Sequence, residues 1–132
     1  MRSSSQEEED RDTLATPVYE KKALATFRGD TVVLGGTRSL FVQLLPAWLE
    51  VVTSAMDDFD LLVLKAESYF LSTLASIVGA MRLARLLMAF RLACDDHAME
   101  LHALRRQLHC IRSEIRLVLC YFTQVGSGSK AK

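Results

Sequence analysis

An apolar repeat runs through residues 80–125 and constrains the fold more than any other feature of the sequence. No Pro, Gly or Asn interrupts this stretch. A 3-4-3-4 spacing selects fourteen positions, and thirteen of them are apolar, against fifteen of the thirty-two others. This pattern is typical of a helix that packs along another helix. It predicts an interaction seam made of Leu83, Leu87, Phe90, Leu101, Leu104, Leu108, Ile111, Ile115, Val118 and Phe122.

The region before the seam predicts more helix. The apolar stretch Leu40–Met56 has Pro46 in its middle, so its helix either kinks there or begins there, and otherwise Thr37 or Ser39 can cap its start. Acidic residues near Asp57 predict a turn that leads into the next helix. That helix carries small side chains at four-residue intervals, which form a packing ridge for a close neighbour: Ser68, Ser72, Ser76, Ala80 and Ala84.

The pair Asp95-Asp96 decides which helical fold is formed. No Gly or Asn follows Ala93, and the apolar repeat passes through without a shift in phase. We therefore favour an unbroken helix from Phe59 to Val125, in which a helical bundle continues into a long helix or coiled coil. The alternative is a three-helix antiparallel bundle with a turn at Asp95-Asp96. Both are all-α folds.

The N-terminal part looks less helical. Residues 1–13 carry a net charge of −3 and predict a disordered acidic tail. Residues 14–38 predict an extended arm or a small β-hairpin, because the apolar runs 23–27 and 31–34 face each other across Gly29. Residues 39–125 then form a helical assembly domain, and residues 126–132 a flexible tail.

A second stripe lies beside the seam and is basic. It consists of His102, Arg105, His109, Arg112 and Arg116. An acidic helix or a phosphate-bearing surface could bind it, more strongly once the His side chains are protonated. Glu100 and Arg105 also have the spacing that pairs charges between parallel coiled-coil strands.

Few residues suggest catalysis or metal binding. Cys94 and His97 lie one helical turn apart, but a metal site needs two further ligands that no spacing supplies. His109-Cys110 lacks an identifiable acid that would orient the His, and no Gly-rich phosphate loop is present. We expect no enzymatic activity, no metal and no cofactor.

The chain has 132 residues, half of them hydrophobic, and one or two helices cannot hide that much apolar surface alone. We therefore expect a non-enzymatic interaction or scaffold subunit that assembles with other helical chains, as a homo- or hetero-oligomer. A membrane surface is the second partner class, through Leu40–Met56 and residues 69–90. The balance of sixteen basic and sixteen acidic residues argues against nucleic acid. Three unpaired Cys and a polar N-terminus indicate a reducing compartment, the cytoplasm or nucleus.

Overall fold

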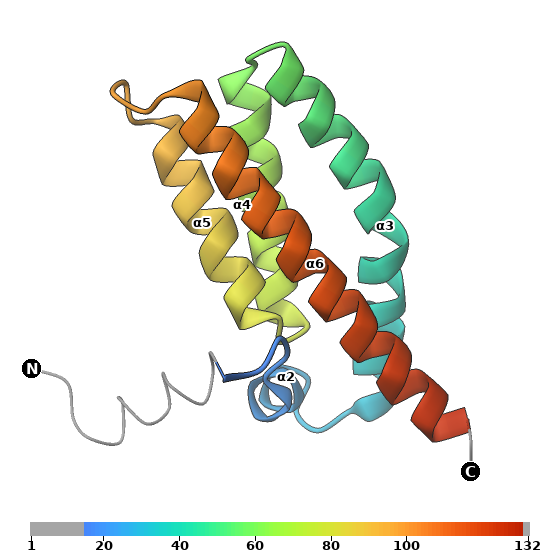
Figure 1. The fold of residues 1–132 in the computed structure, drawn as a ribbon. Helices are drawn as coiled ribbons and strands as arrows, with labels where there is room; N and C mark the ends of the chain where they lie inside the picture. Colours follow the sequence, from blue (N-terminus) through green and yellow to red (C-terminus); the bar gives the residue numbers. More distant parts are fainter. Residues whose placement is uncertain (1–14, 131–132) are drawn as a thin grey trace, which may run out of the picture.

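The computed structural model describes residues 15–130, with side chains as far as Gln124. This part of the chain is helical throughout and contains no strand, so the predicted all-α bundle is confirmed. A short helix, α2, precedes four long ones that run alternately up and down the bundle (Figure 1). Their bounds are α2 Glu20–Thr26, α3 Thr31–Asp57, α4 Leu61–Ile77, α5 Met81–Cys94 and α6 Leu101–Lys130.

The expected hairpin or extended arm over residues 14–38 is wrong. Its first half forms α2, and its second half is the first turns of α3. Gly29, at φ +80°, does make a turn, but it ends a helix instead of joining two strands, and its N–H donates to the Leu24 carbonyl at 2.8 Å. Asp30 then caps α3 by accepting a hydrogen bond from the Val33 N–H at 3.1 Å.

The start of α3 lies earlier than we expected. Gly35 and Gly36 lie inside the helix, and so does Pro46, which therefore does not begin it. Pro removes one backbone hydrogen bond and kinks a helix, and α3 bends along its length in Figure 1. The turn expected near Asp57 is present, and Asp60 caps α4 by accepting from the Val63 N–H at 3.2 Å.

A break at Gly79 divides the helix that was expected to run on from residue 61. Gly79 has φ +89°, which allows α4 to end and α5 to turn back. Its carbonyl accepts from the Tyr19 N–H at 2.8 Å, so the chain before α2 packs on this turn. A Cβ atom added at Gly79 would lie 2.9 Å from the Tyr19 carbonyl oxygen and 2.9 Å from the Ala23 Cβ.

The helix is also broken after Cys94, so the favoured continuity through Asp95-Asp96 is wrong and the turn given as the alternative is right. The Asp96 carboxylate accepts from the Ala98 N–H at 2.9 Å, and this contact shapes the turn. Together with the break at Gly79, this produces four long antiparallel helices instead of three. A fold-back lets the apolar positions before and after the turn bury one another within one chain.

The C-terminal helix is longer than expected. The backbone of α6 stays helical as far as Lys130, so it passes Gly126, where we had placed the start of a flexible tail. The predicted disordered tail over residues 1–13 lies outside the described residues.

The core lies between the four long helices. α3 contributes Trp48, whose indole N–H donates to the Glu67 carbonyl at 3.0 Å and so joins α3 to α4. The largest fully buried side chains come from every long helix: Phe41, Leu45, Val52, Leu64, Leu71, Leu83, Leu87, Phe90, Leu104, Ile111 and Ile115. Burial of this kind is the main stabilising term for a small helical domain.

Candidate functional site

The predicted seam lies mostly inside the chain's own core. Eight of its ten residues are buried, and they come from α5 and α6, which pack against each other. Leu101 is exposed at the start of α6. Phe122 is half-buried and packs edge-on against Phe41, with 6.4 Å between the ring centroids. The apolar repeat therefore joins α5 to α6 within one chain.

The small-residue ridge is split by the turn at Gly79. Ser68, Ser72 and Ser76 belong to α4, whereas Ala80 precedes α5 and Ala84 lies within it. The buried Ser68 hydroxyl donates to the Leu64 carbonyl at 2.6 Å, within its own helix. The Ser72 hydroxyl lies 3.3 Å from the Met88 sulfur of α5. Ser72 therefore contributes to the packing of α4 against α5.

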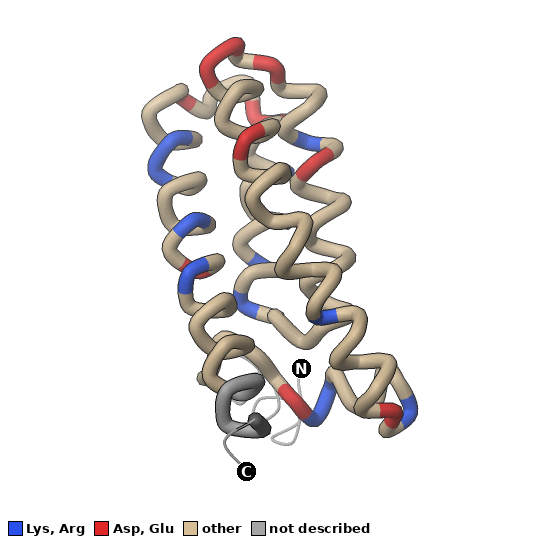
Figure 2. Tube along the Cα trace, turned by 90° about the vertical axis from the view of Figure 1, so that its right-hand side faces the viewer, with Lys and Arg blue, Asp and Glu red and all other residues tan. Residues whose placement is uncertain are grey.

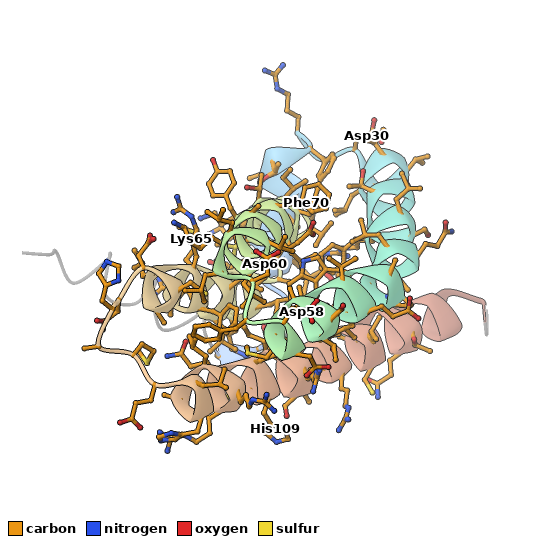
Figure 3. The ribbon with its side chains drawn as sticks, turned by 90° about the horizontal axis from the view of Figure 1, so that it is seen from above. Asp30, Asp58, Asp60, Lys65, Phe70 and His109 are labelled. Carbon is orange, nitrogen blue, oxygen red and sulfur yellow. The ribbon has the colours of Figure 1, made fainter. Side chains whose placement is uncertain are left out.

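The basic stripe lies on one exposed strip of α6. Figure 2 shows Arg positions repeating along this helix, and Figure 3 shows His109 on its outer side. His102, Arg105, His109 and Arg116 are exposed, while Arg112 is half-buried and donates to the Thr53 hydroxyl of α3. Glu100 lies in the turn before α6, and its carboxylate is 3.0 Å from the His102 Nδ1.

The most unusual exposed surface is on α3. We define the α3 face as Val32, Gly36, Leu40, Ala47 and Val51, which fall on one side of the helix. All five are exposed; Val32 is 83% exposed, Leu40 65% and Val51 45%. None is charged, and Figure 2 shows α3 free of charge over most of its length. This face was not predicted from the sequence, although only one charged residue, Arg38, occurs between residues 31 and 49.

Other exposed apolar side chains gather on α4. Of the eleven large hydrophobic side chains exposed in the described residues, four belong to α3 and three to α4. The α4 members are Leu62, Tyr69 and Phe70. Phe70 lies on the side of the bundle away from α6 (Figure 3). A solvated helix normally carries charged residues on such positions, so both helices differ from an ordinary surface.

A polar cluster ties the N-terminal helix to the bundle. The Arg38 guanidinium donates to both Glu20 carboxylate oxygens, at 2.7 and 3.2 Å, and to the Val78 carbonyl at 3.2 Å. The Tyr121 hydroxyl donates to Glu20 at 2.6 Å. Arg38 also lies 4.8 Å from the centre of the Phe122 ring. No sequence spacing could have revealed this cluster, because its members come from α2, α3 and α6.

The cluster changes the acidity of its members. Burial raises the pKa of Glu20, but the hydrogen bonds from Arg38 and Tyr121 outweigh it, so the net pKa lies below its ordinary value of 4.5. Burial, together with the Glu20 carboxylate, raises the pKa of Tyr121 to about 12. At neutral pH the cluster is therefore an ion pair with a neutral phenol.

The residues considered for metal binding do not come together. Cys94 is buried at the end of α5, whereas His97 is exposed in the turn. Burial, followed by the charge of Asp95, raises the Cys94 pKa to about 11, which disfavours the thiolate that a metal requires. In the described residues no three His, Cys, Asp or Glu side chains are grouped so that they could hold a metal ion.

One helix of the described part, α3, is long and apolar enough to cross a membrane by length and composition alone. Only 33% of its most apolar window is buried within the bundle. The other stretch considered for a membrane, residues 69–90, is interrupted by the turn at Gly79. Core helices of soluble proteins pass the same test.

In comparisons with known proteins, no protein-family model, no curated protein and no solved structure matches the chain.

Proposed function

We propose that this protein is a non-enzymatic interaction subunit, which binds another helical protein chain along the α3 face. The observation that carries the proposal is the exposure of Val32, Leu40 and Val51 on one side of α3, where the exposed Glu50 lies towards the C-terminal end of the helix. Removing such a stripe from water is favourable, at about 25 cal/mol for each Å² of apolar surface buried.

The shape of the α3 face suits a helix as its partner. Its members repeat at intervals of four and seven residues, and the stripe from Val32 to Val51 is about 29 Å long at 1.5 Å per residue. Gly36 and Ala47 have small side chains, so a neighbouring helix can approach closely at those points. The burial of most seam residues of α5 and α6 within the chain supports α3, and not the seam, as the partner surface.

The test is a charge placed on the α3 face. We expect Leu40→Asp to weaken assembly at least tenfold, because the partner would have to bury a carboxylate. The matched control is Leu92→Asp, since Leu92 is 64% exposed and lies on α5. Assembly is measured as solution mass by light scattering, and as cross-linked partners recovered from the native source.

Two outcomes would contradict the proposal. One is a wild-type protein that stays monomeric at every concentration and forms no cross-link through α3. The other is an equal loss of assembly in both variants, which would mean that any added charge interferes.

A membrane surface is the second candidate for the same face. The length and apolar composition of α3 favour it. In liposome flotation, recovery of the wild type but not of Leu40→Asp would support lipid as the partner. If neither protein floats, with or without anionic lipid, the membrane candidate fails and the protein-partner proposal stands unchanged.

A further inference from the structure

A cavity of about 780 Å³ opens between α2, the first half of α3 and the C-terminal part of α6. Its volume lies in the range of about 300–1,000 Å³ that is usual for small-molecule sites. Four apolar side chains line it, namely Leu24, Leu34, Val42 and Phe122. Hydroxyl and amide groups of Thr31, Ser39, Gln43 and Thr123 complete the walls and offer hydrogen bonds.

The charges in this cavity are already paired. Among the described residues, the charged ones that line it are Glu20 and Arg38, and they form the two-point ion pair described above. The Arg38 side chain is only 13% exposed, and it also donates to the Val78 carbonyl. A charged ligand would therefore have to disrupt this pair or stay without a counter-charge, at a cost in desolvation. The electrostatics favour an uncharged ligand.

Gly35 forms part of the cavity wall and leaves space beside it. It lines the wall from inside α3, where Gly is less favourable than Ala by roughly 1 kcal/mol. A Cβ atom added there would meet nothing within 4 Å, so packing does not require Gly at this position. A larger side chain on the same wall would occupy the space instead.

We propose that this cavity binds an uncharged, largely apolar small molecule that carries a hydrogen-bonding group. The apolar side chains would cover most of the molecule, and the hydroxyls of the wall would bind its polar group. This site is separate from the proposed partner surface, because Val32, Leu40 and Val51 do not line the cavity.

The test uses the full chain and the uncharged fluorescent probe N-phenyl-1-naphthylamine. We expect saturable binding of one probe per chain. The variant Gly35→Phe should weaken binding at least tenfold, because its ring enters the cavity. The control is Val33→Phe: Val33 is an exposed residue of the same helix, and it belongs neither to the cavity lining nor to the α3 face.

Further measurements keep the test decisive. If Gly35→Phe does not fold, as judged by circular dichroism, Ser39→Leu blocks the same wall one turn later. The anionic relative of the probe, 8-anilino-1-naphthalenesulfonate, should bind at least tenfold more weakly than the neutral probe. The absence of saturable binding, or equal binding to the Gly35→Phe and Val33→Phe variants, would overturn the site. Equal affinity for both probes would overturn the preference for uncharged ligands.

Discussion

Arg82 of α5 and Glu114 of α6 form a two-point ion pair. Their Nε–Oε2 distance is 3.0 Å and their Nη2–Oε1 distance is 3.1 Å. Glu114 is only 8% exposed, so it is the one acidic residue counted among the buried side chains of the described part. The pair sits beside the apolar seam and fixes how α5 and α6 align, because a shift of either helix would leave the carboxylate without its partner.

The first prediction concerns this pair. Replacing Arg82 by Met should lower the free energy of unfolding by about 1–3 kcal/mol, because Glu114 is left buried without a counter-charge. The double variant Arg82→Met with Glu114→Leu should recover most of the loss, since two apolar groups can pack there. Urea denaturation followed by circular dichroism measures both values.

A control separates this effect from a general loss of positive charge. Arg106→Met removes an exposed Arg of α6 and should change stability by no more than about 0.5 kcal/mol. A double variant as unstable as Arg82→Met alone would count against the pairing of α5 and α6 described here.

The second prediction concerns the stability of the fold at alkaline pH and depends on Tyr121. Its pKa is raised from 10.0 to about 12 in the folded protein. Between these values the unfolded chain loses the phenol proton while the folded chain keeps it, so stability falls as pH rises from 10 to 12. In Tyr121→Phe this part of the decline should disappear, which urea denaturation at pH 9, 10 and 11 would measure.

Glu20 leads to a corresponding prediction for the stability of the fold at acidic pH. Its folded pKa lies below 4.5, so its contribution is present above the unfolded pKa and is lost as pH falls through the folded value. Glu20→Gln should therefore be less stable than the wild type at pH 7 and lose less stability on acidification to pH 3. Identical acid profiles for the two proteins would mean that the cluster of Glu20, Arg38 and Tyr121 is not formed in solution.

The all-α class could be predicted because it depends on local patterns. The turn at Asp57, the faces of the helices and the basic stripe follow from composition and spacing. The sequence predicted the seam but not that it packs within one chain. The same 3-4-3-4 spacing occurs where two helices of one chain pack together and where helices of two chains do. Packing within one chain requires that the chain turn at Asp95-Asp96, and no Gly at this position indicates a turn.

Other features depended on contacts between distant parts of the chain. Gly79 was passed over because Leu and Ala on both sides continue a helical pattern, although Gly near the end of such a pattern is a known stop. Gly29 was recognised as a turn but assigned to a hairpin, because apolar runs lie on both sides of it. The pairing of Glu20 with Arg38 and Tyr121 joins residues up to 101 positions apart, and no local pattern encodes it.

The third prediction compares two glycines. Gly79→Ala should destabilise the protein by at least about 1–2 kcal/mol, because a side chain disfavours φ +89° and its Cβ would approach Tyr19 and Ala23 at 2.9 Å. Gly36→Ala should stabilise it by about 0.5–1 kcal/mol, since Gly36 lies in a helix with free space around it. Opposite shifts in the thermal midpoint confirm the turn, and a neutral Gly79→Ala would show that α4 continues into α5.

The fourth prediction uses the three cysteines to test whether the end of α5 is packed into the core. Cys110 and Cys120 are exposed, whereas Cys94 is 6% exposed and its pKa is about 11. The thiolate is the reactive form, so at pH 8 two thiols per chain should react with Ellman's reagent quickly and the third much more slowly. Peptide mapping by mass spectrometry should identify the slow one as Cys94, and all three should react at once in 6 M guanidinium. Cys94 is the last residue of α5, and it belongs to the buried core of the bundle. Fast reaction of all three thiols in the native protein would therefore mean that the end of α5 is not packed into this core.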